Sequence, residues 1–237
     1  MRACINSLRR LGVATAAALC LASGQVGAAQ PVSLELVLAI DCSLSVNDPE
    51  YYLQLRGIAA AFRDEEVIAA IVQRRAGVAV TLAQWDGTSN NHQEPPWRFL
   101  TDRASVIAFA DEIDQVRRAK LGYTTGVGYA IDYARGLINN NEFIGEEKKI
   151  DISGDGRNNS GPRPEDARAR AIADGTTING LAVIDGDPGL PSYYETFVAG
   201  GDGAFVITAD SYDDFAEAIR KKLRRELRLR ITQREEQ

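Results

Sequence analysis

The 237-residue sequence is short of the side chains that cross-link small domains or move protons in active sites: it has three cysteines and one histidine. Cys4 and Cys20 lie in a leader-like segment, so the rest of the chain has one thiol, Cys42, and forms no internal disulfide. His92 lies in a polar stretch without helical periodicity, where a histidine is usually solvated. We expect Cys42 to be a buried thiol of low reactivity at a strand end.

The leader-like segment covers residues 1–29. Arg2, Arg9 and Arg10 precede an apolar run from Leu11 to Ala22, which is too short to span a bilayer, and small residues follow. This order is typical of a cleaved signal peptide. We therefore predict a periplasmic or secreted protein whose mature chain begins near residue 29 or 30.

The sequence also lacks an excess of basic residues. Residues 30–237 contain 24 basic and 33 acidic side chains, a net charge of −9, which argues against nucleic acid and anionic membranes as partners. These 208 residues suit one α/β domain with a large core. No internal repeat, low-complexity tract or later transmembrane run is evident, and we expect a monomer.

One stretch organises the rest of the chain. Residues 34–40 are almost all apolar, which predicts a strand buried on both faces of a sheet. The strand runs into Asp41, Ser43 and Ser45, and a spacing of two in an extended segment points both hydroxyls the same way. Hard oxygen ligands gathered in this manner suit Mg²⁺ or Mn²⁺. The same pattern also fits a turn that caps the next helix, and the stretch alone leaves both interpretations open.

Strand and helix patterns alternate along the remaining chain. The 11 residues from Asp86 to Pro96 are too few for a crossover helix, so strand 97–100 should return antiparallel at a sheet edge. The alternation predicts an α/β fold of three layers, doubly wound, with a mostly parallel sheet and one antiparallel edge strand. The other predicted strands are 77–85, 149–153, 177–184 and 204–208, and the predicted helices are 49–62, 64–73, 103–115, 126–138, 164–174, 193–199 and 212–227.

Three separate loops should meet at one edge of this sheet. In the doubly wound order 3-2-1-4-5-6, strands one and four are neighbours at the switch point where such folds bind ligands. Asp41 ends strand one, Asp155 ends strand four, and Thr125 lies on the connection that enters strand four. Together with Ser43 and Ser45 they bring two carboxylates and three hydroxyls to one crevice. Turn capping explains each residue singly but not their convergence.

These residues resemble the metal-ion-dependent adhesion site of the von Willebrand factor A (VWA) domain. The matching parts are Asp41-x-Ser43-x-Ser45, Thr125 with Ala130-Ile131, and Asp155-Gly156. The spacing to Ala130 favours Thr125 over Thr124. The resemblance covers about residues 32–230. The leader and the turns at 153–159 and 200–205 look like those of a family of bacterial exported A-domain proteins of undefined function. It implies a signal peptide over 1–29 and a VWA-like domain over 30–237.

The resemblance also implies how an ion would be held. Ser43 and Ser45 would bind Mg²⁺ or Mn²⁺ directly, Asp41 and Asp155 would act largely through water, and Thr125 would do either. Two features depart from the family pattern. Gly154 stands where typical members have Thr or Ser, and Asp151 places a charge in a strand that should be buried.

The leading functional hypothesis is a binding module, not an enzyme, that grips an acidic side chain of a partner protein through the ion. A metal-independent interaction domain is the first alternative. A hydrolase at the same crevice, using metal or a Cys42–His92 pair, is the second, although no other histidine exists to serve as base. We expect a solvated face for the seven basic residues that end the last predicted helix, which are Arg220, Lys221, Lys222, Arg224, Arg225, Arg228 and Arg230.

Overall fold

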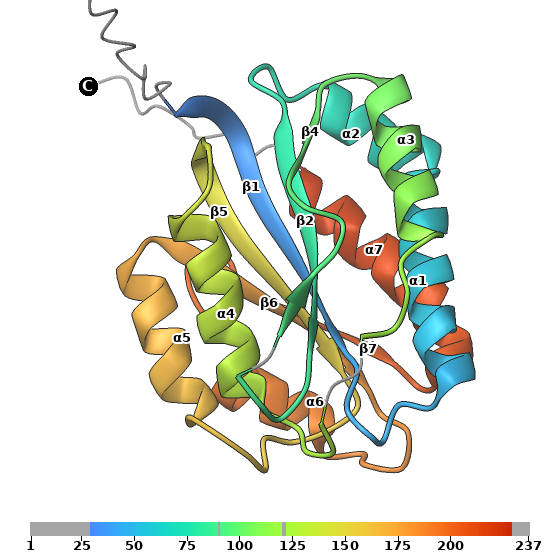
Figure 1. Cartoon of the computed structure of the whole chain (residues 1–237), viewed down its shortest axis with the longest axis vertical. Helices are drawn as coiled ribbons and strands as arrows, with labels where there is room; N and C mark the ends of the chain where they lie inside the picture. Colours follow the sequence, from blue (N-terminus) through green and yellow to red (C-terminus); the bar gives the residue numbers. More distant parts are fainter. Residues whose placement is uncertain (1–28, 90, 120–121, 229–237) are drawn as a thin grey trace, which may run out of the picture.

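The computed structural model describes residues 29–89, 91–119 and 122–228, so residues 1–28 of the predicted signal peptide lie outside it. In the described part, a seven-stranded sheet is covered by helices on both faces (Figure 1). The strands are β1 (Gln30–Asp41), β2 (Val78–Trp85), β3 (His92–Gln93), β4 (Arg98–Leu100), β5 (Phe143–Gly154), β6 (Thr176–Val183) and β7 (Val206–Ala209). Their order is β3-β2-β1-β5-β6-β7, and β4 also pairs with β2.

The predicted fold class is confirmed. Strands β1, β2, β5, β6 and β7 run parallel, while β4 returns antiparallel beside β2, as expected for residues 97–100. The two-residue strand β3, also antiparallel to β2, was not predicted because its polar loop has no alternating apolar pattern. Strand β5 begins at Phe143 rather than at 149, since its first half contains a glycine and several charges but still pairs with β1 from Gln30 onward.

The helices form two layers. They are α1 (Asp48–Phe62), α2 (Glu65–Val72), α3 (Arg103–Ile113), α4 (Val127–Asn139), α5 (Pro164–Ala173), α6 (Leu190–Tyr193) and α7 (Phe215–Leu227). In Figure 1, α1, α2, α3 and α7 cover one face of the sheet, and α4 and α5 cover the other. No helix in the described ranges is long and apolar enough to cross a membrane. The predicted helix at 193–199 is a short α-helix followed by a π-helical turn over Tyr194–Val198, and a 3₁₀ turn over Tyr212–Asp214 precedes the last helix.

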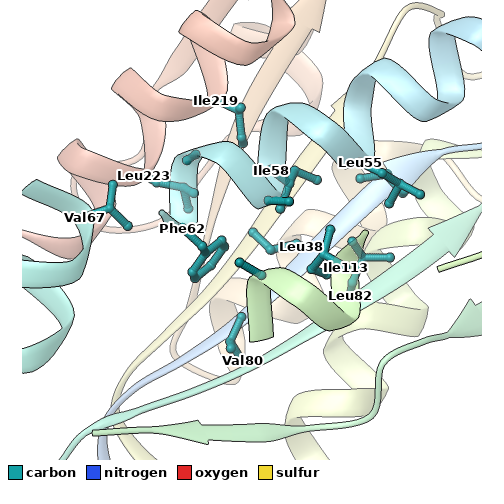
Figure 2. Packing of buried hydrophobic residues seen from close by; sticks show 14 of the residues in the cluster. Leu38, Leu55, Ile58, Phe62, Val67, Val80, Leu82, Ile113, Ile219 and Leu223 are labelled. Carbon is teal, nitrogen blue, oxygen red and sulfur yellow. The ribbon is translucent and has the colours of Figure 1, made fainter. Parts of the chain in front are cut away.

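Strand β1 contributes to two hydrophobic cores. Leu38 faces the larger core, where Leu55 of α1 and Leu223 of α7 pack over the sheet (Figure 2). The next residues on either side, Val37 and Ala39, face the smaller core under α4 and α5. Because successive side chains point to opposite faces, a strand buried on both sides needs apolar residues at nearly every position. This explains why the apolar run that organises the sequence has no polar face.

The charge predicted inside β5 has a partner on α7. Asp151 is 1% exposed, and its carboxylate lies 2.6 Å from the Lys222 ammonium, which also lies 2.7 Å from a Glu226 oxygen. Asn179 of β6 donates a hydrogen bond of 2.7 Å to that same Glu226 oxygen. Burial raises the pKa of Asp151 to about 7; Lys222 opposes this rise and Glu226 adds to it. The cluster holds two buried carboxylates for one ammonium.

The expectation of a solvated basic face on α7 was wrong for Lys222, whereas Lys221, Arg225 and Arg228 are exposed. Lys222 is buried because the helical spacing places it on the side that faces the sheet. Arg224 donates to Asp64 at the start of α2 over 2.7 Å, and the Arg225 guanidinium lies 3.8 Å from the centre of the Phe205 ring. Arg230 lies outside the described residues.

Candidate metal-ion site

The candidate site lies at the carboxyl edge of the sheet, which is the lower edge in Figure 1. Strand β1 ends at Asp41, and its pairing with β5 aligns Ile40 with Ser153, so Gly154 and Asp155 follow beside Asp41. From β1 the chain continues to β2 on one side, and from β5 to β6 on the other. This is the switch point at which doubly wound sheets bind ligands.

All five predicted residues are contiguous in space. The Ser43 amide donates to Asp41 Oδ1 over 2.8 Å, and the Ser43 and Ser45 hydroxyl oxygens are 3.1 Å apart. The Ser45 hydroxyl donates to Asp155 Oδ1 over 2.7 Å, and Thr125 Oγ1 lies 3.5 Å from Ser43 Oγ. Neighbouring ligands of an octahedral ion with bonds of about 2.1 Å lie about 3 Å apart. The oxygen spacing therefore suits a small divalent ion.

The structure brings Thr125, and not Thr124, to this cluster. Thr125 is buried and faces Ser43, whereas Thr124 is exposed. Thr124 instead packs over Gly87, where an added Cβ would lie 1.8 Å from its hydroxyl oxygen. A glycine at position 87 is thus needed for the loop that carries Thr125 to pass this close.

The electrostatics of the two carboxylates favour a bound cation. Asp41 is fully buried, and Asp41 Oδ2 and Asp155 Oδ2 have no hydrogen-bond partner among the described residues. Burial, with repulsion from Asp155, raises the pKa of Asp41 to about 8, although hydrogen bonds from Ser43 oppose the rise. Burial also raises the pKa of Asp155, against the hydrogen bond from Ser45. A divalent ion would relieve both the repulsion and the loss of solvation.

The donor set itself fits a hard ion. It combines two carboxylates with three hydroxyls, all oxygen ligands of the kind that Mg²⁺ and Mn²⁺ prefer. Across the described ranges, no group of three His, Cys, Asp or Glu side chains gathers in a metal-binding arrangement. An ion at this site would therefore depend on Ser43, Ser45 and Thr125 as well as on the carboxylates.

The turn after β5 holds Thr125 in place, a role that the sequence did not reveal. Asn159 Oδ1 accepts from the Thr125 amide and the Asn159 amide donates to the Thr125 carbonyl, both over 2.8 Å. Asn158 Oδ1 accepts from the Gly128 amide at the start of α4 over 3.1 Å. The three loops are thus joined by backbone contacts as well as by the ligand oxygens.

Asp86, directly after β2, was also missed. It is fully buried, and its Oδ1 accepts from the Thr88 amide over 2.7 Å. Its other oxygen accepts from the Gly122 amide, in the connection that leads to Thr125. A carboxylate at the end of an apolar strand was the available signal, since Asp41 and Asp155 follow their strands in the same way.

Arg118 clamps the loop after β1. Its guanidinium donates to the carbonyls of Cys42 and Ser43 over 3.2 Å each and to that of Val46 over 2.6 Å. It also donates to the Asp48 carboxylate over 2.7 Å. The side chain comes from a segment 75 residues away from Ser43, so no local pattern could indicate it.

Gln84 of β2 joins three segments behind the site. Its Oε1 accepts from Tyr51 Oη and the Ala119 amide, both over 2.8 Å, and from Cys42 Sγ over 3.4 Å. Cys42 is a free, buried thiol, and burial raises its pKa, as does nearby Asp41. The ring of His92 lies 3.4 Å from Glu94, so Cys42 and His92 have different hydrogen-bond partners.

A family comparison covers almost the whole described chain. The family described as "Protein of unknown function (DUF1194)" matches residues 31–231. The chain belongs to this family. No curated protein matches it.

Solved structures at low sequence identity have the same fold. Proximal thread matrix protein 1 (PTMP1) from the mussel byssus is 19% identical with a TM-score of 0.61, over 84% of this chain and 47% of that one. A second PTMP1 structure has a zinc-occupied metal-ion-dependent adhesion site motif. It is 17% identical with a TM-score of 0.61, over 84% of this chain and 47% of that one. This chain spans about half the length of PTMP1.

Two bacterial structures extend the likeness. The von Willebrand factor domain of the type V pili tip protein Mfa5 from Porphyromonas gingivalis is 13% identical, with a TM-score of 0.55, over 84% of this chain and 97% of that one. A von Willebrand factor type A protein from Catenulispora acidiphila is 17% identical, with a TM-score of 0.53, over 83% of this chain and 43% of that one. The DUF1194 chain therefore has a VWA-like fold, as its sequence motifs predicted.

Proposed function

We propose that this protein is an exported binding module that holds a partner protein through a divalent cation. Asp41, Ser43, Ser45, Thr125 and Asp155 would hold the ion, Mg²⁺ or Mn²⁺. The supporting observation is the pair of carboxylates at the switch point of the sheet, Asp41 fully buried and Asp155 half-buried. Each has one unpartnered oxygen, and Ser43 and Ser45 join them. Zinc in the corresponding motif of PTMP1 is consistent with this proposal.

The partner group that best suits such an ion is a carboxylate. Three of the five candidate ligands are neutral, so a divalent ion held partly through water keeps much of its charge. An octahedral ion would also exchange a water for an oxygen of the partner. The net charge of −9 from residue 30 onward opposes the approach of an acidic partner, so association should be slowest at low salt.

The surface around the site suits a protein partner. Leu44, between the two serines, is 65% exposed, and Tyr123, two residues before Thr125, is 80% exposed. A hollow of about 480 Å³ lies between them, with Arg118 and Asp48 in its lining. Exposed apolar and aromatic side chains beside a polar anchor are typical of protein contact surfaces.

Metal binding is tested by thermal unfolding of chelator-treated protein with and without Mg²⁺. An ion at a hundred times its dissociation constant stabilises the fold by about 2.7 kcal/mol, which raises the melting temperature by roughly 5–10 °C for a domain of this size. Asp41→Ala should abolish the rise. Glu65→Ala, which removes an exposed carboxylate from α2, should keep it. An unchanged melting temperature for the wild type would contradict the proposed site.

Partner binding is tested by capture from a periplasmic extract with Mg²⁺ or with chelator. Binding should require the metal, tolerate moderate salt and be lost in Thr125→Ala. The competing surface is a hollow of about 300 Å³ beside α7 that includes Arg225, Arg228 and Phe205. Capture that survives chelator but fails in Arg225→Glu/Arg228→Glu would assign binding to that surface and refute the ion-mediated mechanism.

A further inference from the structure

The last residue of β5, Gly154, lies against a closely packed group of side-chain atoms. A Cβ added there would lie 2.8 Å from Asp41 Oδ2, 2.9 Å from Tyr194 Oη and 3.1 Å from Trp85 Cζ2. The position thus has no room for a side chain. The unpartnered Asp41 oxygen and the Tyr194 hydroxyl face the same point.

Tyr194 reaches this point from the first residue of the π-helical turn Tyr194–Val198 that follows α6. Its side chain is fully buried in the smaller core. Gly180 of β6 makes room for the ring, because a Cβ there would lie 2.9 Å from Tyr194 Cδ1. Glycines on two neighbouring strands therefore form a slot that admits the ring, and π-helical turns are frequent at functional sites.

The hydroxyl at the end of this slot has no hydrogen-bond partner among the described residues. Burial, with the nearby Asp41 carboxylate, raises the pKa of Tyr194 well above its usual value, so the group remains an O–H donor. Asp41 Oδ1 is already bound by the Ser43 amide, whereas Asp41 Oδ2 lacks a donor. A buried donor and a buried acceptor, both unsatisfied and directed to one point, indicate a shared role.

We propose that Tyr194 is a positioning residue for the ion site: its O–H donates to Asp41 Oδ2 across one water and fixes the carboxylate for the ion. This inference rests on the proposed function. It also accounts for Gly154, because the tyrosine hydroxyl occupies the space that a serine or threonine side chain would need. Groups that orient metal-binding side chains in this way typically change metal affinity 10- to 100-fold when removed.

The test is Tyr194→Phe, with Mg²⁺ affinity measured by calorimetric titration. We expect the dissociation constant for Mg²⁺ to rise at least tenfold. In chelator the variant should still fold, with a melting temperature lowered by only a few degrees, because it removes one hydroxyl and its hydrogen bond. Tyr133→Phe, which deletes a phenol hydroxyl from α4 beside the same core, should leave the affinity unchanged. A Tyr194→Phe variant that folds in chelator and binds Mg²⁺ as the wild type does overturns the inference, and so does one that no longer folds in chelator, since that would show a purely structural role.

A double-mutant cycle with Gly154→Ser tests the shared space. Gly154→Ser alone should weaken Mg²⁺ binding, because the new side chain collides with the Tyr194 hydroxyl and Asp41. The double variant Gly154→Ser/Tyr194→Phe should bind Mg²⁺ more tightly than it would if the affinity losses of the two single variants simply added. The reason is that the serine hydroxyl enters the space that the tyrosine hydroxyl has left. Additive losses would overturn the inference. A wild type that binds no Mg²⁺ would overturn the proposed function together with the inference, whereas failure of the variants alone would leave the proposed function standing.

Discussion

Asp151→Asn should change how the stability of the fold responds to pH. Burial, with Glu226 adding and Lys222 opposing, raises the pKa of Asp151 from 3.8 to about 7. Between these values the folded state keeps a proton that the unfolded state has released. The free energy of unfolding therefore falls as pH rises through this window. The asparagine side chain of the variant has no such proton to lose, and it leaves Lys222 and Glu226 as a balanced pair.

The size of the effect follows from the shift. A rise in pKa from 3.8 to about 7 lowers the free energy of unfolding by about 4 kcal/mol in total as pH increases. About 3 kcal/mol of this loss falls between pH 5 and pH 8. The stability of Asp151→Asn relative to the wild type should therefore increase by about 3 kcal/mol over that range. Lys222→Met should instead lower the free energy of unfolding at pH 8 by about 3–5 kcal/mol, because it leaves two buried carboxylates uncompensated.

Urea unfolding followed by tryptophan fluorescence, in chelator and at several pH values, measures these differences. Asp41 and Asp155 also have raised pKa values, but their contribution is common to the wild type and the variant and cancels in the comparison. A difference between Asp151→Asn and wild type that stays constant from pH 5 to pH 8 would refute the assignment of a shared buried charge to this cluster.

Three further predictions concern other parts of the chain. Cys42 is 3% exposed with a raised pKa, so a thiol reagent should label it slowly in the folded protein and rapidly in urea; equal rates would contradict its buried position. The native exported protein should begin near residue 29 or 30, and a mass that includes residues 1–28 would refute cleavage. Leu38→Ala should lower the free energy of unfolding by about 2–5 kcal/mol, because this 1%-exposed side chain fills the larger core. A loss below about 1 kcal/mol in urea unfolding would argue against that packing.

The sheet order could be predicted because its central strands are buried on both faces. Burial of this kind requires a continuous apolar run, and such runs at 34–40 and 77–85 are visible without a structure. The first half of β5 could not be predicted, since the stretch from Phe143 contains a glycine and several glutamates and lysines in place of an apolar run, although it pairs with β1. The inward side of α7 was misjudged because a buried Lys222 depends on carboxylates supplied by other segments.

The candidate ligands could be predicted because each one stands directly at the end of a strand or the start of a helix. The groups that hold them could not. Arg118, Asn159 and Tyr194 act on residues from distant segments, and nothing in their own neighbourhoods distinguishes them from surface or core residues. The two departures from the family pattern, Gly154 and Asp151, were visible in the sequence, and the structure accounts for both by tertiary partners.

The hydrogen bonds of Gln84 have a consequence for hydrogen exchange. Ala119 lies in a connection without regular secondary structure, whose amides ordinarily exchange with solvent in local openings. Its amide, however, shares one acceptor with Tyr51 of α1 and Cys42 after β1, and that acceptor belongs to a fully buried strand. Opening Ala119 therefore disturbs groups on three elements at once. Its amide should exchange about as slowly as those of β2, so that Ala119 opens together with the centre of the sheet.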